Sequence, residues 1–245
     1  MSATTSQERA TLRVGVGTGV VTSIEQFSIP GSDRSPGTSA AGLTRKPKGP
    51  SSGERVLQVQ IERAAAYLKD NLKATAGFHA ALLLAGQSGE LVLYSQWRSE
   101  EAAPVKAPEE WSLAPAVPGL DRVDARTYVV DFTAPDVVSE ASLSATPHAH
   151  FGVFTVDPAN QEPMLELARR YAPGSMGTPG LAAINFHRSL DGERVINLGL
   201  WHGFGEFDNL FTRPGFDQGG EYWTGVATFR PHFFDVVAVV TAEEA

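Results

Sequence analysis

The chain has 245 residues, of which 42% are hydrophobic and 20% charged, so its composition is that of a folded globular protein with a sizeable core. Its net charge is -8 and its longest basic cluster is Arg45, Lys46 and Lys48, which excludes the basic footprint that nucleic-acid binding requires. The absence of cysteine excludes disulfides, thiolate metal ligands and cysteine catalysis. Residues 1–10 lack an apolar signal core and no long apolar run follows, so we expect a cytoplasmic protein without membrane contact.

The first half of the chain predicts a strand, a long irregular loop, a helix, a hairpin and a further strand. The loop is rich in Ser, Gly and Pro, and loops of this length within a compact domain are uncommon. The glycines at 86 and 89 suit the hairpin turn. In chain order the expected ranges are 12–22 for the strand, 23–53 for the loop, 54–74 for the helix, 78–85 and 91–97 for the hairpin, and 126–132 for the last strand.

The second half predicts the same order of elements. Asp157 before Pro158 suits the start of a helix. The expected ranges are 151–156 for a strand, 159–171 for a helix, 181–188 and 194–201 for a hairpin, 205–211 for a short helix and 233–240 for a closing strand.

Matching landmarks indicate that the halves are diverged copies of one unit. Gly77 and Gly89 are 12 residues apart, as are Gly180 and Gly192, and a tryptophan ends the strand that follows in each half. The shared β-α-β-β-(α)-β order predicts an α+β fold of two ferredoxin-like repeats, 11–135 and 148–245, whose sheets cover each other as a pseudo-dimeric α+β barrel.

The most informative segment for function is the strand predicted at 194–201. Alternation along a strand places Asn197, Gly199 and Trp201 on one face, with the small glycine between an amide and an indole. Such a face suits a flat aromatic ligand that packs against the indole while the amide hydrogen-bonds to its oxygen. An ordinary core tryptophan at a strand end is the alternative interpretation.

This arrangement resembles the antibiotic-biosynthesis monooxygenase family. The resemblance rests on the strand, helix and hairpin order, on Asn197 and Trp201 at the end of the third strand, and on the aromatic residues Phe204, Phe207 and Phe211 that follow. It covers both repeats, and the fused two-copy form is similar to the oxygenases that open the B ring of angucyclines in jadomycin-, gilvocarcin- and kinamycin-type pathways.

The resemblance implies an oxygenase that inserts oxygen from O2 into a polycyclic aromatic polyketide, with ring opening or quinone formation. Asn197 would hold the enolate or phenolate oxygen and Trp201 would pack beside the reacting ring. The resemblance implies no tightly bound cofactor or metal, and leaves open reduced flavin (FADH2 or FMNH2) as a diffusible cosubstrate from a separate flavin reductase. The N-terminal copy departs from the pattern because Leu93 stands four residues before Trp97, so its pocket is expected to be degenerate.

Further candidates come from the neighbouring strands and from the aromatic C-terminal segment. His187, on the strand predicted to pair with that of Asn197, is a candidate proton carrier, with a solvent-facing histidine as the alternative. The remaining candidates are expected to line a substrate pocket, and they are Phe186, Phe204, Phe207, Trp223, Trp97 and His79.

Two other patterns are weaker. His148 and His150 have a spacing compatible with metal binding, but no third ligand is identifiable, so no metal is predicted. The glycines at 15, 17 and 19 lie within a predicted strand and do not open a helix, which argues against a dinucleotide-binding loop.

Two other functions remain open. A non-catalytic barrel that binds a pathway intermediate, or that scaffolds other enzymes, also fits a duplicated chain with one altered pocket. Haem degradation is disfavoured because Phe211 stands where related haem-degrading barrels carry a histidine ligand. The sequence does not decide whether the chain forms a homodimer.

Overall fold

A computed structural model describes residues 10–31, 52–86, 89–103, 113–203 and 221–242. The strands are β1 (Thr11–Gly15), β2 (Val21–Ser28), β3 (Phe78–Gly86), β4 (Glu90–Trp97), β5 (Asp121–Ala134), β6 (Val138–Ser142), β7 (His148–Val156), β8 (Leu181–Ser189), β9 (Arg194–Trp201) and β10 (Ala227–Thr241). The helices are α2 (Ser52–Asn71), α3 (Leu113–Ala116) and α4 (Gln161–Tyr171), with short 3-10 turns at Leu72–Ala74, Pro158–Asn160 and Ala172–Gly177.

Eight strands form one closed antiparallel barrel in the order β10-β3-β4-β2-β5-β8-β9-β7. Within it β5-β2-β4-β3 and β10-β7-β9-β8 each have the strand order of a ferredoxin-like unit, and the units join where β10 pairs with β3 and β5 pairs with β8. The α+β barrel of two repeats is therefore confirmed. All four landmark glycines, 77, 89, 180 and 192, have φ between 79° and 84°, the left-handed conformation that glycine tolerates best.

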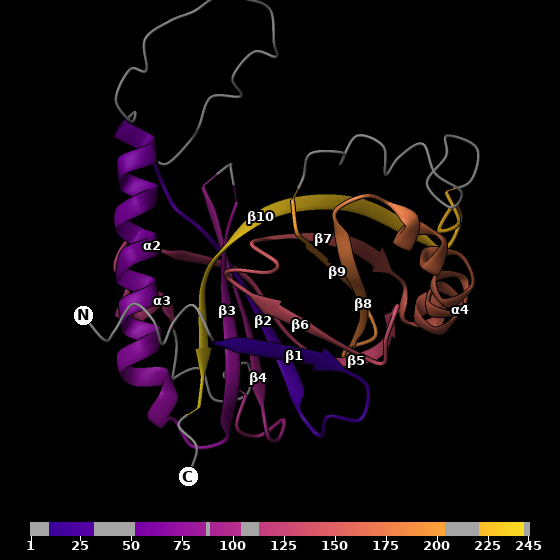
Figure 1. Cartoon of the computed structure of the whole chain (residues 1–245), viewed down its shortest axis with the longest axis horizontal. Helices are drawn as coiled ribbons and strands as arrows, with labels where there is room; N and C mark the ends of the chain where they lie inside the picture. The colour runs from indigo at the N-terminus through magenta and orange to yellow at the C-terminus, as the bar shows by residue number, and fades with distance from the viewer. Residues whose placement is uncertain (1–9, 32–51, 87–88, 104–112, 204–220, 243–245) are drawn as a thin grey trace, which may run out of the picture.

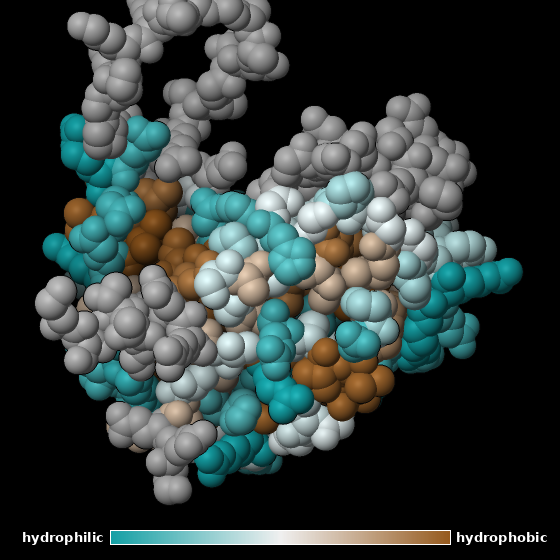
Figure 2. All heavy atoms as spheres, viewed as in Figure 1, coloured by the Kyte–Doolittle hydropathy of each residue, from teal (hydrophilic) through white to brown (hydrophobic). Residues whose placement is uncertain are grey.

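Each half covers the outer face of its sheet with helix. Figure 1 shows α2 and α4 on opposite sides of the barrel. On α2 the buried positions include Leu57, Gln60, Ala64 and Leu68, spaced three to four residues apart. Val56 and Val59 lie one residue off this stripe and are 37% and 43% exposed. Figure 2 shows hydrophilic side chains along the outside of this helix and hydrophobic ones between it and the sheet.

The strand predicted at 12–22 is in fact two strands. A turn around Gly17 and Gly19, both with positive φ, separates β1 from β2. β2 continues to Ser28, so the first residues of the predicted loop are strand, and residues 32–51 lie outside the described part of the chain. β1 pairs with β6, a strand that the sequence did not reveal, to form a separate two-stranded ribbon.

This ribbon contributes to the core of the barrel. Leu12, Val14 and Ala141 are fully buried in the cluster formed by inward-facing barrel residues such as Leu82 and Leu198. The amide of Gln96, near the end of β4, donates to the backbone oxygen of Arg13 at 2.7 Å. The ribbon therefore packs into the barrel from the end at which β4 and β9 finish. In the described part of the chain, no helix combines the length and apolar character needed to cross a bilayer.

Candidate functional site

Strand β9 separates its residues between the barrel interior and the α4 side, as the alternation predicts. Ile196, Leu198 and Leu200 belong to the interior cluster. Asn197, Gly199 and Trp201 occupy the alternate positions, and Trp201 is fully buried in the cluster that packs against α4. The three residues therefore share one face of the sheet.

The space that Gly199 leaves between the amide and the indole is filled by His150. This residue of β7 pairs directly with Gly199, and a Cβ added to Gly199 would lie 1.9 Å from the imidazole Cε1 atom. The indole Nε1 of Trp201 donates to His150 Nδ1 at 2.7 Å, and Asn197 Nδ2 lies 3.4 Å from His150 Nε2. The sequence offered no sign of this role, because strand pairing brings the histidine in from 47 residues away.

Hydrogen bonding determines which ring nitrogen of His150 carries the proton. An indole N–H only donates, so Nδ1 of His150 accepts and Nε2 carries the proton of the neutral ring. Burial lowers the pKa of His150 to about 4, which keeps the ring neutral at pH 7. The Oδ1 atom of Asn197 accepts the backbone N–H of Asn185 at 3.2 Å, which orients the amide. Two N–H groups, one from each side chain, therefore lie side by side.

Aromatic residues pack on the same face of the C-terminal sheet. Phe186 pairs with Asn197 across the strands and stacks on Phe132 at 4.6 Å between ring centroids. Trp223 contacts Phe154 and Phe229 at 5.6 and 4.6 Å. Two predicted pocket residues, Phe186 and Trp223, thus belong to the cluster beside Asn197, whereas Phe204 and Phe207 lie outside the described residues, as does the helix expected at 205–211.

The structure places His187 on the opposite face of the sheet, inside the barrel. Residues that pair directly share a face, and the partner of Asn197 is Phe186, so its neighbour His187 points the other way. His187 donates from Nδ1 to the backbone oxygen of Asn185 at 3.0 Å and accepts from the Tyr94 hydroxyl at 2.9 Å. Burial lowers its pKa to about 4. His187 therefore does not join Asn197 and Trp201 in one site.

The first half has its own buried tryptophan. Trp97 donates from Nε1 to Ser95 Oγ at 2.8 Å and packs edge-on against Phe78 in the cluster under α2. His79 is exposed. His148, whose spacing from His150 is compatible with metal binding, instead meets Asp235 at 2.8 Å.

Glu25 was not among the predicted site residues, because it lies in a segment predicted to be loop. Its side chain is fully buried, its oxygens accept no hydrogen bond from the described residues, and Arg122 Nη1 approaches to 3.5 Å. Burial raises the pKa of this carboxyl to about 7 against the smaller opposing effect of Arg122. The hydroxyls of Ser23 and Thr127, a directly paired couple on neighbouring strands, likewise lack partners among the described residues.

Comparison with solved structures shows the same fold in several proteins. An anthrone oxidase-like protein superposes with a TM-score of 0.72 at 16% identity, over 95% of this chain and 98% of that one. A candidate monooxygenase from Fusobacterium nucleatum gives 0.58 at 7% identity over 92% and 96%, and a candidate chlorite dismutase gives 0.52 at 7% over 89% and 94%. No family model and no curated protein matches the sequence.

Proposed function

We propose that the protein is an oxygenase of electron-rich polycyclic phenols or hydroquinones, and that the C-terminal site holds the substrate oxygen as an anion. The observation that carries this proposal is the pair of N–H groups on Asn197 and His150, 3.4 Å apart between their nitrogens. Both groups are donors, so the contact between them is not a hydrogen bond, whereas an oxygen beside both accepts from each. This is the donor geometry that stabilises a developing oxyanion.

The surroundings of this pair suit such a substrate. The buried indole of Trp201 and the aromatic cluster around Phe186 offer flat apolar surface, against which fused rings pack. Exclusion of water strengthens the interaction of the N–H groups with an anion. A neutral histidine donates to a phenolate without introducing a second titration near pH 7, since its pKa is about 4.

The proposed chemistry follows from the anion. A deprotonated phenol or anthrone can give one electron to O2, and recombination of the two radicals forms a carbon–oxygen bond. Loss of water from the resulting peroxide leaves a carbonyl, so one oxygen atom enters the product and the other leaves as water. The substrate supplies all the electrons. The name of the anthrone oxidase-like protein fits this route, and an angucycline-type polyketide with ring opening, with reduced flavin as cosubstrate, is the finer version of the proposal.

Turnover of 1,8-dihydroxyanthrone under 18O2 tests the activity. We expect one 18O atom in the quinone and a rate well above that of the buffer, and removal of one oxyanion donor typically lowers kcat by about 10² to 10³. Asn197→Leu with Trp201→Phe should therefore abolish the acceleration, while the matched N-terminal variant Trp97→Phe retains it. Full turnover by the double variant contradicts the assignment of the site.

A second set of reactions separates oxygenase from binder and tests for flavin. An angucyclinone is incubated with and without a flavin reductase, FAD and NADH. Product only with the reductase identifies reduced flavin as cosubstrate, and product without it identifies the cofactor-free route. Saturable binding of both aromatic probes with unchanged mass under every condition contradicts the oxygenase and favours a carrier of a pathway intermediate.

A further inference from the structure

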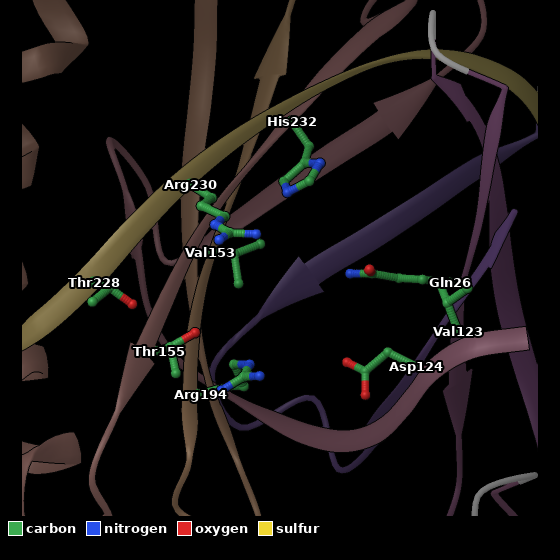
Figure 3. Close-up of a pocket in the computed structure, with 9 residues that line it drawn as sticks. All are labelled: Gln26, Val123, Asp124, Val153, Thr155, Arg194, Thr228, Arg230 and His232. Carbon is green, nitrogen blue, oxygen red and sulfur yellow. The ribbon is translucent and has the colours of Figure 1, made fainter. Parts of the chain in front are cut away.

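The end of the barrel opposite the ribbon opens into a polar cavity of about 530 Å³. It lies where β9 begins and where β2 and β7 finish, and strands from both repeats contribute to it. Figure 3 shows Gln26 and Asp124 reaching in from one side toward Arg230 and His232 on the other. Arg194 and the hydroxyls of Thr155 and Thr228 also line the cavity.

This cavity is distinct from the site around Asn197. Arg194 and Asn197 are on the same strand, but Arg194 is in phase with the inward-facing Ile196 and Leu198, whereas Asn197 faces α4. A ligand in the mouth of the barrel therefore contacts a different face of β9 from a ligand on the Asn197 side.

Two guanidinium groups in the cavity have no carboxylate partner among the described residues. Among the described residues, the Arg194 guanidinium donates only to the backbone oxygen of the adjacent Glu193, at 3.0 Å, and the Arg230 side chain makes no hydrogen bond or ion pair. By contrast, Arg169 meets the carboxylates of Asp131 and Glu162 at 2.6 and 2.8 Å. These two arginines leave unpaired positive charge at one cavity, although the net charge of the chain is -8.

The acidic groups around the mouth contact basic groups other than Arg194 and Arg230. Asp124 lies 3.3 Å from Arg126 Nε, and Arg126 also contacts Asp191 and Glu193. Glu90 lies 3.6 Å from His232, and this contact lowers the pKa of Glu90. The groups left to interact with a ligand can all donate hydrogen bonds, namely the two guanidiniums, the Gln26 amide and the threonine hydroxyls.

We propose that this mouth is a binding site for an organic anion, with a phosphate or carboxylate group held between Arg194 and Arg230. Planar guanidiniums match both groups through paired hydrogen bonds. A cavity of about 530 Å³ falls in the range that holds small organic ligands, so the anion carries an organic body as well as its charge.

Calorimetric titration with phenyl phosphate, benzoate and benzyl alcohol tests the site on the intact chain. We expect saturable binding of at least one of the two anions that weakens as NaCl is raised, and no binding of the neutral alcohol. Preference for phenyl phosphate identifies a phosphate site, and equal or tighter binding of benzoate identifies a carboxylate site. Binding of neither anion, or equal binding of the alcohol, overturns the proposal.

Charge-neutralising variants locate the binding. Arg194→Gln and Arg230→Gln should each weaken the bound anion by about tenfold or more. Arg188→Gln removes the same charge from an exposed residue of β8 outside the cavity, and should leave the affinity unchanged. Equal weakening by all three variants would mean that the anion responds to overall charge alone. The measurement needs no turnover, so its outcome is independent of the proposed oxygenase.

Discussion

Each repeat ends its third strand with a buried tryptophan, and the two repeats provide the acceptor for its indole N–H in different ways. In the C-terminal half Trp201 donates to His150 on the neighbouring strand, and Gly199 provides the room for the imidazole. In the N-terminal half Trp97 donates to Ser95, which stands on its own strand where the other half has the glycine. Both indoles are satisfied, but only one brings a second N–H group beside an amide.

The difference therefore involves several positions that change together. By strand pairing, Ser23 corresponds to His150, Ser95 to Gly199 and Leu93 to Asn197. Opposite Leu93 stands Glu25, where the C-terminal half has Gly152 opposite Asn197. The N-terminal half is thus more than a copy that lost its amide, because it carries a buried carboxyl of its own.

The largest effect is expected from Gly199→Ser, which gives the C-terminal half the serine of the N-terminal half. A Cβ at this position collides with the imidazole of His150, so the donor pair is displaced. We expect kcat to fall by about 10² to 10³, and the free energy of unfolding in urea to fall by about 1 to 3 kcal/mol from overpacking.

Two controls accompany this variant. Gly203→Ser changes a glycine whose added Cβ meets no atom of the described residues within 4 Å, and should leave stability unchanged. The double variant His150→Ser with Gly199→Ser reproduces the Ser23 and Ser95 pair, so it should recover stability without recovering activity. Activity retained by Gly199→Ser alone would contradict the role of the imidazole.

Asn197→Leu also gives the C-terminal half a residue of the N-terminal half, because Leu93 is the residue that corresponds to Asn197. It removes a donor from the site and leaves the backbone N–H of Asn185 without its acceptor. We expect an activity loss of the same order as for the glycine variant, and a stability loss of about 1 to 3 kcal/mol, the cost of a buried unsatisfied group. The reciprocal Leu93→Asn should create no second activity, because the N-terminal half lacks the histidine. A gain of turnover in that variant would show that the amide alone suffices.

The sequence predicted those parts of the site and fold that depend on local pattern. Alternation along β9 placed Asn197, Gly199 and Trp201 on one face, and the landmark glycines marked both hairpins. Features that depend on the pairing of strands far apart in the sequence could not be predicted. β1 finds its partner more than a hundred residues away in β6, and His150 joins the site only through the register of β7 with β9. The sequence did not show on which face of the sheet His187 lies, because a shift of one residue in the register of a strand moves each of its side chains to the other face.

A third prediction uses the buried carboxyl of Glu25 to separate the halves by pH. Its pKa is about 7 in the folded chain and that of an exposed glutamate, near 4.5, in the unfolded chain, so the folded state binds the proton more tightly. The stability that this carboxyl contributes is present below pH 4.5 and is lost as the pH rises through about 7. Glu25→Gln should therefore gain about 2 kcal/mol relative to the parent chain between pH 5 and pH 8.

The titration of His150 and His187 changes the stability with pH in the opposite direction. Each has a pKa lowered from 6.5 to about 4, so stability is lost as the pH falls from 6.5 toward 4, when the unfolded chain takes up protons that the folded chain excludes. The free energy of unfolding in urea is measured at each pH for Glu25→Gln and for the parent chain. The pH dependence that the histidines contribute is common to both proteins, so it cancels in the difference. A difference that does not change with pH would show that Glu25 is not buried in its neutral form.

The smallest effect concerns hydroxyls, and it tests whether the buried polar groups of the N-terminal half are truly unsatisfied. Thr127 Oγ1 is buried and accepts and donates no hydrogen bond among the described residues, whereas Ser189 Oγ bonds to Asp191 at 2.6 Å and accepts the backbone N–H of Arg194 at 2.9 Å. Thr127→Val removes an unpaired polar atom at nearly constant shape, so stability should stay level or rise by up to about 1 kcal/mol. Ser189→Ala removes a paired one and should cost about 1 to 2 kcal/mol. If Thr127→Val instead costs as much as Ser189→Ala, an ordered water or a bound molecule must form a hydrogen bond with the Thr127 hydroxyl. The two halves would then differ in what binds to their buried polar groups, and not in whether these groups are satisfied.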